Sequence, residues 1–163
     1  MCGIIGATSS RSVGKILIKG LHAMEYRGYD SAGVALNQDS EVFRLRSLGK
    51  VSSLEELMIN NKPKAKSGIA HTRWATHGAP SEENAHPHGS HNEIYIVHNG
   101  IIENHDEIRE KLKEKGYKIA SETDSELIAH LIHLNKTDSS STLEALIKAT
   151  KELKGAFSIA AIS

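Results

Sequence analysis

Several features that would assign a protein to a particular environment are scarce or missing in this sequence. Its 163 residues include one cysteine, so no disulfide can form within the chain, which fits a reducing, cytoplasmic compartment. No apolar run approaches the ~18 residues of a membrane span, and no basic segment followed by an apolar one marks a signal peptide. Twenty basic residues balance twenty acidic ones, so neither nucleic acid nor an anionic membrane is an expected partner.

The length and the succession of strand and helix patterns predict one domain of the α+β class. A chain of 163 residues with a hydrophobic fraction of 39% is long enough to bury one modest core. Residues 31–38 and 41–46 are joined by the turn formers Asp39 and Ser40, which predicts a hairpin and therefore antiparallel pairing. Other short apolar runs predict strands at 2–7, 68–75, 93–98, 117–120 and 156–162.

Apolar residues at helical spacing, together with capping residues, predict the helices. The first is expected from Ser12 to about Gly28, and Ser53 with Glu56 resembles a capping box for a second, short helix. Further helices are expected after Asn104, after the SETD segment at 121–124 and after Thr142.

Two boundaries bear on the site. Residues 76–92 are expected to form a polar loop, and the strand at 93–98 is expected to break at Asn99-Gly100. The strand at 156–162 has no polar tail to cover it, so we expect the chain to be a fragment whose fold is truncated at its C-terminal end.

Cys2 directly follows Met1. Trimming of Met1 would make Cys2 the mature N-terminus, with a thiol of ordinary pKa ~8.5 beside an α-amine of ordinary pKa ~7.7–8.0. The amine could then accept the thiol proton, so a nucleophilic Cys2 would need no histidine partner. The alternative is that Cys2 is a small buried hydrophobic residue on the first strand.

Five segments, taken together, resemble the class II glutamine amidotransferases. In chain order they are CGIIG at 2–6, YRGYDSAG at 26–33, HTRWATHG at 71–78, NAHPH at 84–88 with HNGIIEN at 98–104, and ETDSELIAHL at 122–131. The third and fourth are similar to the glutaminase domain of the glucosamine-6-phosphate synthase family. The resemblance implies an N-terminal-nucleophile hydrolase-like sandwich of antiparallel sheets between helical layers. Residues 2–163 would then be a partial amidotransferase domain, without its C-terminal part and without the sugar-isomerase domains.

The resemblance also implies a role for residues around the reacting carboxamide of glutamine. Cys2 corresponds to the nucleophile, and the Asn99 side chain with the Gly100 backbone N–H corresponds to the donors that stabilise the oxyanion. Without the flanking motifs, Asn-Gly after a strand would be read as an ordinary turn. Arg27 resembles a residue beside the nucleophile, with a surface ion pair as the alternative.

Glutamine also carries an α-carboxylate and an α-ammonium group that need partners. Arg73 resembles the clamp for the carboxylate, a role that suits its two-pronged guanidinium. Asp124 matches the residue that takes the ammonium, and Thr123 or Asp124 could alternatively cap the following helix. Both roles can hold together if the start of the helix presents the carboxylate. The loop that in the family folds over bound glutamine contributes the remaining residues, Trp74, Thr76 and His77.

Histidine is unusually frequent, with ten in the chain. The spacing of His86, His88 and His91 could indicate a metal site, but no cysteine or carboxylate completes a ligand set and no HExxH motif is present. The resemblance accounts for His71, His77, His86 and His98 without a metal, with His86 and His98 as supporting residues. We therefore expect no metal and no cofactor, and we expect His91 to be a solvated loop residue.

The function implied by the resemblance is hydrolysis of L-glutamine to glutamate and ammonia through a thioester on Cys2. In the complete enzyme, expected to be a homodimer, the ammonia would convert fructose 6-phosphate to glucosamine 6-phosphate on the isomerase domains. The competing hypothesis is a non-catalytic fragment or regulatory relic.

Overall fold

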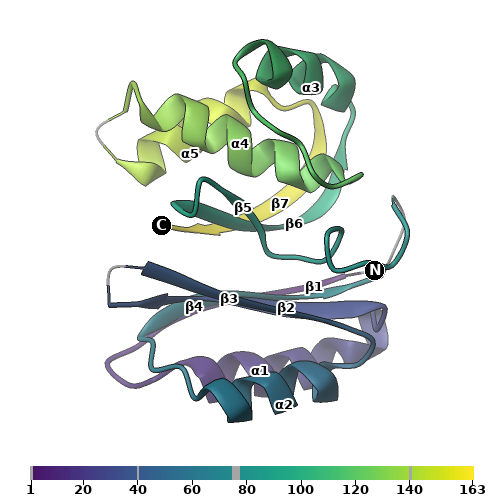
Figure 1. Ribbon diagram of the computed structural model, residues 1–163, viewed down its shortest axis with the longest axis vertical. Helices are drawn as coiled ribbons and strands as arrows, with labels where there is room; N and C mark the ends of the chain where they lie inside the picture. The colour runs from purple at the N-terminus through teal and green to yellow at the C-terminus, as the bar shows by residue number, and fades with distance from the viewer. Residues whose placement is uncertain (1, 40, 75–77, 140) are drawn as a thin grey trace.

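The computed structural model describes residues 2–39, 41–74, 78–139 and 141–163, which form two stacked antiparallel sheets with helices on both outer faces (Figure 1). Within these residues, the first sheet has the strand order β1-β4-β2-β3 and the second the order β5-β6-β7. The strands of the first sheet are β1 (Gly3–Thr8), β2 (Ser31–Gln38), β3 (Glu41–Leu48) and β4 (Ser67–Arg73). Those of the second are β5 (His88–Ser90), β6 (Ile94–Ile102) and β7 (Gly155–Ile162).

Helices cover the outer face of each sheet, as the α+β sandwich prediction requires (Figure 1). The first sheet is covered by α1 (Gly14–Met24), which continues into a 3-10 turn η1 (Glu25–Arg27), and by α2 (Val51–Asn61). The second is covered by α3 (His105–Glu114), α4 (Asp124–Lys136) and α5 (Thr142–Glu152). No helix within the described ranges has the length and apolar character that crossing a membrane demands.

Apolar side chains fill each layer of the sandwich, but unequally. One large cluster packs α1 and α2 on the first sheet, and another packs α3, α4 and α5 on the second. Helix α4 lies at the centre of its layer, so every side chain from Ser125 to Ile132 is buried. Between the sheets the apolar cluster is small, with the buried members Ala35, Ile69, Tyr95 and Val97. The space between the sheets therefore also contains buried polar side chains, and these form the candidate site.

The strand predicted to break at Asn99-Gly100 instead continues through both residues to Ile102. The strand can continue because residue 100 is a glycine. Its φ of +134° is a conformation that residues with a side chain rarely adopt, and an added Cβ would lie 2.1 Å from the Ala156 carbonyl oxygen of β7. The Asn-Gly pair is thus part of a paired strand and not a turn.

Other local predictions were wrong for identifiable reasons. No strand forms at 117–120, because the N–H groups of Ala120 and Ser121 donate to the Glu126 carboxylate. Strand β5 forms within the predicted 76–92 loop, where three residues pair with β6. Two predicted caps are displaced: Lys50 precedes α2 without a side-chain cap, and Ser141 rather than Thr142 caps α5. Asn104 occupies the predicted N-cap position of α3, but its side chain forms no capping hydrogen bond.

Gly33 allows the segment before β5 to cross the inner face of the first sheet. A Cβ at this position would lie 2.0 Å from the His86 carbonyl oxygen, so no side chain can be accommodated. This close approach places His86 between the sheets.

A matched pair of leucines tests the position assigned to α4. Leu131 is fully buried, whereas Leu143 on α5 is 65% exposed. We expect Leu131→Ala to lower the free energy of unfolding by about 2–5 kcal/mol, because it removes packed methyl groups and leaves a cavity. Leu143→Ala should change it by less than about 0.5 kcal/mol. Urea unfolding followed by circular dichroism measures both, and equal losses would contradict the assigned packing.

Candidate active site

Cys2 lies immediately before β1 and is hydrogen-bonded to residues of both sheets. Its Sγ accepts a hydrogen bond from the Trp74 backbone N–H at 3.2 Å, next to the end of β4. Its carbonyl oxygen accepts one from Asn99 Nδ2 at 3.2 Å, from the middle strand of the second sheet. The Cys2 side chain is only partly buried. These contacts hold both the backbone and the sulfur of Cys2, and the residue remains partly exposed.

Asn99 is held at both ends of its amide. While Nδ2 donates to Cys2, Oδ1 lies 2.9 Å from Nε2 of His71. Gly100 follows, with its backbone exposed. The two residues predicted as oxyanion donors therefore lie beside the predicted nucleophile, although they come from a different sheet.

Arg73 ends β4 and is buried, with 4% of its surface exposed. Its guanidinium donates to the backbone carbonyls of Gly78 and Ala79, at 3.2 and 3.5 Å. Burial lowers the pKa of Arg73, while the nearby Cys2, Asp30 and Asp124 act in the opposite direction. The side chain therefore presents a cation close to Cys2.

Asp124 begins α4, and the structure resolves the two alternatives for its segment. Thr123 is the N-cap, because its Oγ1 accepts from the Glu126 N–H at 3.4 Å. The Asp124 carboxylate instead accepts from the Ile102 N–H at 2.9 Å and from the Ser125 hydroxyl at 3.3 Å. Capping by Thr123 thus leaves the Asp124 carboxylate directed toward the site.

A small cavity of about 50 Å³ collects most of the predicted site residues, which come from the residue before β1, the end of β4, the segment before β5, strand β6 and the start of α4. Its lining comprises Cys2, Arg73, Trp74, His86, His98, Asn99, Gly100, Thr123, Asp124 and Ser125. A hollow of about 270 Å³ shares Cys2 and Asn99 with it and includes Arg27, so Arg27 lies on the other side of the nucleophile. The predicted loop residues Thr76 and His77 lie outside the described residues.

Three buried, neutral histidines form a cluster at this cavity, and one of them, His86, lines it. The rings of His71 and His86 are 4.0 Å apart, and those of His86 and His88 are 4.7 Å apart. Burial lowers the pKa of His71 to about 4, that of His88 to about 3, and that of His86 well below its ordinary value. At neutral pH these rings therefore fill space without adding charge, and those of His71 and His88 also form hydrogen bonds.

The other predicted supporting histidine, His98, is bonded to the start of α4. Its Nδ1 lies 2.8 Å from the Ser125 hydroxyl and 3.8 Å from a carboxylate oxygen of Asp124. Burial lowers the pKa of His98, and Asp124 opposes that shift. His98 thus links β6 to the residue predicted to take the ammonium.

The histidine spacing that suggested a metal site does not bring three ligands together. Over the described residues, no group of three or more His, Cys, Asp or Glu side chains is arranged to hold a metal ion. His91 turns away from His86 and stacks on His133, with ring centroids 4.1 Å apart. His91 is exposed in a turn, as predicted, but it contacts another ring.

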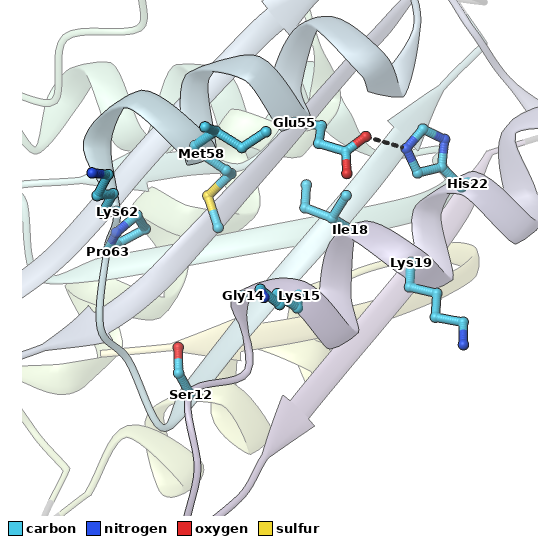
Figure 2. A pocket seen from close by; sticks show the side chains of 11 residues that line it. Ser12, Gly14, Lys15, Ile18, Lys19, His22, Glu55, Met58, Lys62 and Pro63 are labelled. Carbon is cyan, nitrogen blue, oxygen red and sulfur yellow. Dashed lines mark hydrogen bonds and ion pairs between the residues drawn. The ribbon is translucent and has the colours of Figure 1, made fainter.

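A much larger hollow lies elsewhere, between α1 and α2, with a volume of about 820 Å³ (Figure 2). Apolar side chains such as Ile18 and Met58 line it, and His22 and Glu55 meet across it at 2.9 Å. None of the residues predicted for the site contributes to its lining. Choosing the candidate site by cavity volume alone would therefore miss the predicted catalytic and binding residues.

Sequence reasoning passed over His71 as a site residue. The available signal was its position two residues before Arg73, because alternate residues of a strand share a face. His71 and Arg73 both belong to β4 and both are buried.

A family profile described as glutamine amidotransferase domain matches residues 71–163, more than half of the chain. The chain belongs to this family. Curated relatives extend the similarity to the first residues of the glutamine amidotransferase domain. Glutamine–fructose-6-phosphate aminotransferase [isomerizing] from Haemophilus influenzae is 56% identical over 158 residues, which are 96% of this chain and 26% of the relative. The protein of the same name from Pseudomonas putida is 54% identical over 164 residues, 100% of this chain and 27% of its own. The chain thus spans about a quarter of the length of these relatives.

Two solved structures share the fold of this amidotransferase domain. Glutamine phosphoribosylpyrophosphate amidotransferase from B. subtilis, complexed with ADP and GMP, aligns with a TM-score of 0.84 at 23% identity, over 100% of this chain and 35% of its own. A structure described as the allosteric regulatory enzyme of purine biosynthesis aligns with a TM-score of 0.85 at 24% identity, over 99% of this chain and 35% of its own. The predicted sandwich of antiparallel sheets between helical layers is therefore confirmed.

Because the buried histidines have lowered pKa values, we expect acid to destabilise the fold at pH values well above the pKa values of these histidines in the native state. In the unfolded chain a histidine titrates near pH 6.5, whereas His71 and His88 titrate near 4 and 3 when folded. Between these limits the unfolded chain binds more protons, so the free energy of unfolding falls as the pH falls. Each such histidine should contribute about 2 kcal/mol of loss between about pH 7.5 and pH 5.

Urea unfolding at the two pH values measures this loss. The variant His88→Gln removes one titrating ring and should reduce the pH dependence by that contribution. A stability that does not change between the two pH values would contradict the neutral, buried state of the rings.

Proposed function

We propose that this chain is the glutaminase domain of a glutamine–fructose-6-phosphate aminotransferase, and that it hydrolyses glutamine through a thioester on Cys2. The observation that carries the proposal is the shared cavity of Cys2, Asn99, Arg73 and Asp124. The nucleophile Cys2 and the amide donor Asn99 suit the carboxamide of glutamine. The cation Arg73 suits its α-carboxylate, and the anion Asp124 suits its α-ammonium.

The reaction begins once Met1 has been removed, because the α-amine of Cys2 must be free. The amine takes the thiol proton and the sulfur adds to the carboxamide carbon, forming the C–S bond. The negative charge on the carboxamide oxygen is then met by the Asn99 Nδ2 and the Gly100 N–H. The protonated amine gives its proton to the departing nitrogen, the C–N bond breaks, and ammonia leaves a thioester.

Hydrolysis completes the cycle with the same groups. Water attacks the thioester carbon while the amine accepts a proton from it, and the second oxyanion meets the same donors. The C–S bond breaks, the thiol regains its proton, and glutamate is released. Arg73 holds the α-carboxylate and Asp124 the α-ammonium throughout, so they contribute to binding more than to bond breaking.

The reaction of the complete protein follows from the names of the relatives. We propose that the released ammonia aminates fructose 6-phosphate on further domains of that protein, since the similar proteins from two bacteria bear that name and are about four times as long. Residues 2–163 would then be the N-terminal part of it. A homodimer and a cytoplasmic location stay predictions, the second favoured by the need to keep Cys2 reduced.

The decisive experiment labels the nucleophile. An electrophilic glutamine analogue should attach once, at Cys2, in protein whose mass shows that Met1 is absent. Cys2→Ala should abolish both labelling and glutamate release, measured by a coupled assay. A label on another residue, or unchanged glutamate release from Cys2→Ala, would exclude the proposed chemistry.

The binding role of Asp124 has a matched control. We expect Asp124→Asn to raise the KM for glutamine by about 10- to 100-fold, because a charged hydrogen bond to the ammonium becomes a neutral one. Asp106 also stands in the first turn of a helix, but its side chain is 88% exposed on α3. Asp106→Asn should leave KM unchanged in the same steady-state assay. An unaltered KM for Asp124→Asn would remove the ammonium role.

A further inference from the structure

His71 contacts the predicted oxyanion donor without lining the cavity. It lies on β4, opposite Ile4 of β1 and Gly33 of β2, and it is 1% exposed. Its Nε2 is 2.9 Å from Asn99 Oδ1 and 3.2 Å from the backbone carbonyl oxygen of His98. One imidazole nitrogen thus faces two oxygen atoms of β6.

The partners of this contact determine where the hydrogens are. A backbone carbonyl can only accept, so the contact with His98 requires that Nε2 of His71 carries the hydrogen. At the other end of the amide, the Cys2 carbonyl also can only accept, so the atom of Asn99 that faces it must be Nδ2. The two ends agree, because a reversed amide would set oxygen against oxygen at Cys2 and N–H against N–H at His71.

We propose that His71 is a positioning residue: its Nε2–H fixes the Asn99 amide so that Nδ2 faces the oxyanion that develops beside Cys2. This role rests on the proposed function. An amide NH₂ group has two hydrogens, of which one is donated to the Cys2 carbonyl. The second can then meet the oxyanion without a rotation of the side chain during the reaction. A donor that is already oriented stabilises the transition state more than one that must reorganise.

The surroundings of His71 suit a constant, uncharged donor. Burial lowers its pKa to about 4, so the ring is neutral at physiological pH, and the His86 ring lies against it at 4.0 Å. A hydrogen bond to Oδ1 also polarises the amide and strengthens donation from Nδ2. The ring contributes this without adding a second cation beside Arg73, which lies two residues further along β4.

Two amide substitutions separate the donor from the bulk of the ring. In His71→Gln the side-chain nitrogen can reach the place of Nε2, whereas in His71→Asn it reaches only the place of Nδ1. In the complete protein, we expect His71→Asn to lower kcat for glutamate release by about 3- to 10-fold, the factor attached to one neutral hydrogen bond. His71→Gln should stay within about 2-fold of the parent. The KM for glutamine should change little in either, because Asn99 acts after binding.

A double-mutant cycle tests whether the effect passes through Asn99. Asn99→Ala alone should lower kcat by about 10²–10³-fold, as loss of an oxyanion donor does. In that background His71→Asn should have almost no further effect, because the side chain it orients is gone. A loss of the same size in both backgrounds would overturn the proposal, as would a His71→Asn variant with the parent kcat.

Two controls separate positioning from general damage. Alkylation of Cys2 by iodoacetamide forms no oxyanion, so its rate should be the same in parent and His71→Asn; a slower rate would overturn the positioning role. His130→Gln changes another buried histidine, which contacts Ser90 and not Asn99, and should keep the parent kcat. An equal fall of kcat in His130→Gln would assign the effect to packing. Full activity of Asn99→Ala would instead reject the proposed oxyanion chemistry itself, so the two failures are distinguishable.

Discussion

The site depends on one close approach, between the backbone of Cys2 at the edge of the first sheet and the side chain of Asn99 in the middle strand of the second. The 3.2 Å hydrogen bond between them is possible only if the two sheets pack at a fixed separation and register. The packing of α1 and α2 on one sheet and of α4 on the other therefore acts on the chemistry at a distance. The packing that stabilises the sandwich therefore also sets the geometry of the nucleophile.

The interior between the sheets is polar to an unusual degree for a core. It holds histidines and hydroxyl groups where a sandwich would ordinarily place aliphatic side chains, and its apolar cluster is small. Burial keeps these rings neutral, so the protein avoids the large cost of an unpaired charge in the interior. Glu126, in contrast, keeps its charge in a buried position. Burial alone would raise its pKa, but hydrogen bonds from His130 and from the N–H groups of Ala120 and Ser121 lower it to about 2.

The sequence motifs led to the right fold, the right family and the residues that share the cavity, because each motif joins a functional side chain to a strongly patterned element. Helix α4 illustrates this, since its apolar run and the Thr123 cap are both local. What failed depended on distant partners. The N–H groups of Ala120 and Ser121 donate to the Glu126 carboxylate on α4, and the backbone of Gly100 pairs with β7, more than fifty residues later. His71 was overlooked for the same reason, since only the stacked sheets reveal that it contacts Asn99.

The cavity draws its groups from the residue before β1, the end of β4, the segment before β5, strand β6 and the start of α4, so they are spread from residue 2 to residue 125. Because Cys2 precedes the other groups in the sequence, the ribosome must still add Asp124 and the strand β7 that pairs with β6 before the pocket can close. Throughout that interval the second sheet is incomplete and no closed pocket surrounds Cys2. Removal of Met1, which the proposed mechanism requires, can thus take place on a nascent chain, before the pocket is assembled. The order of translation itself separates maturation of the nucleophile from assembly of the pocket.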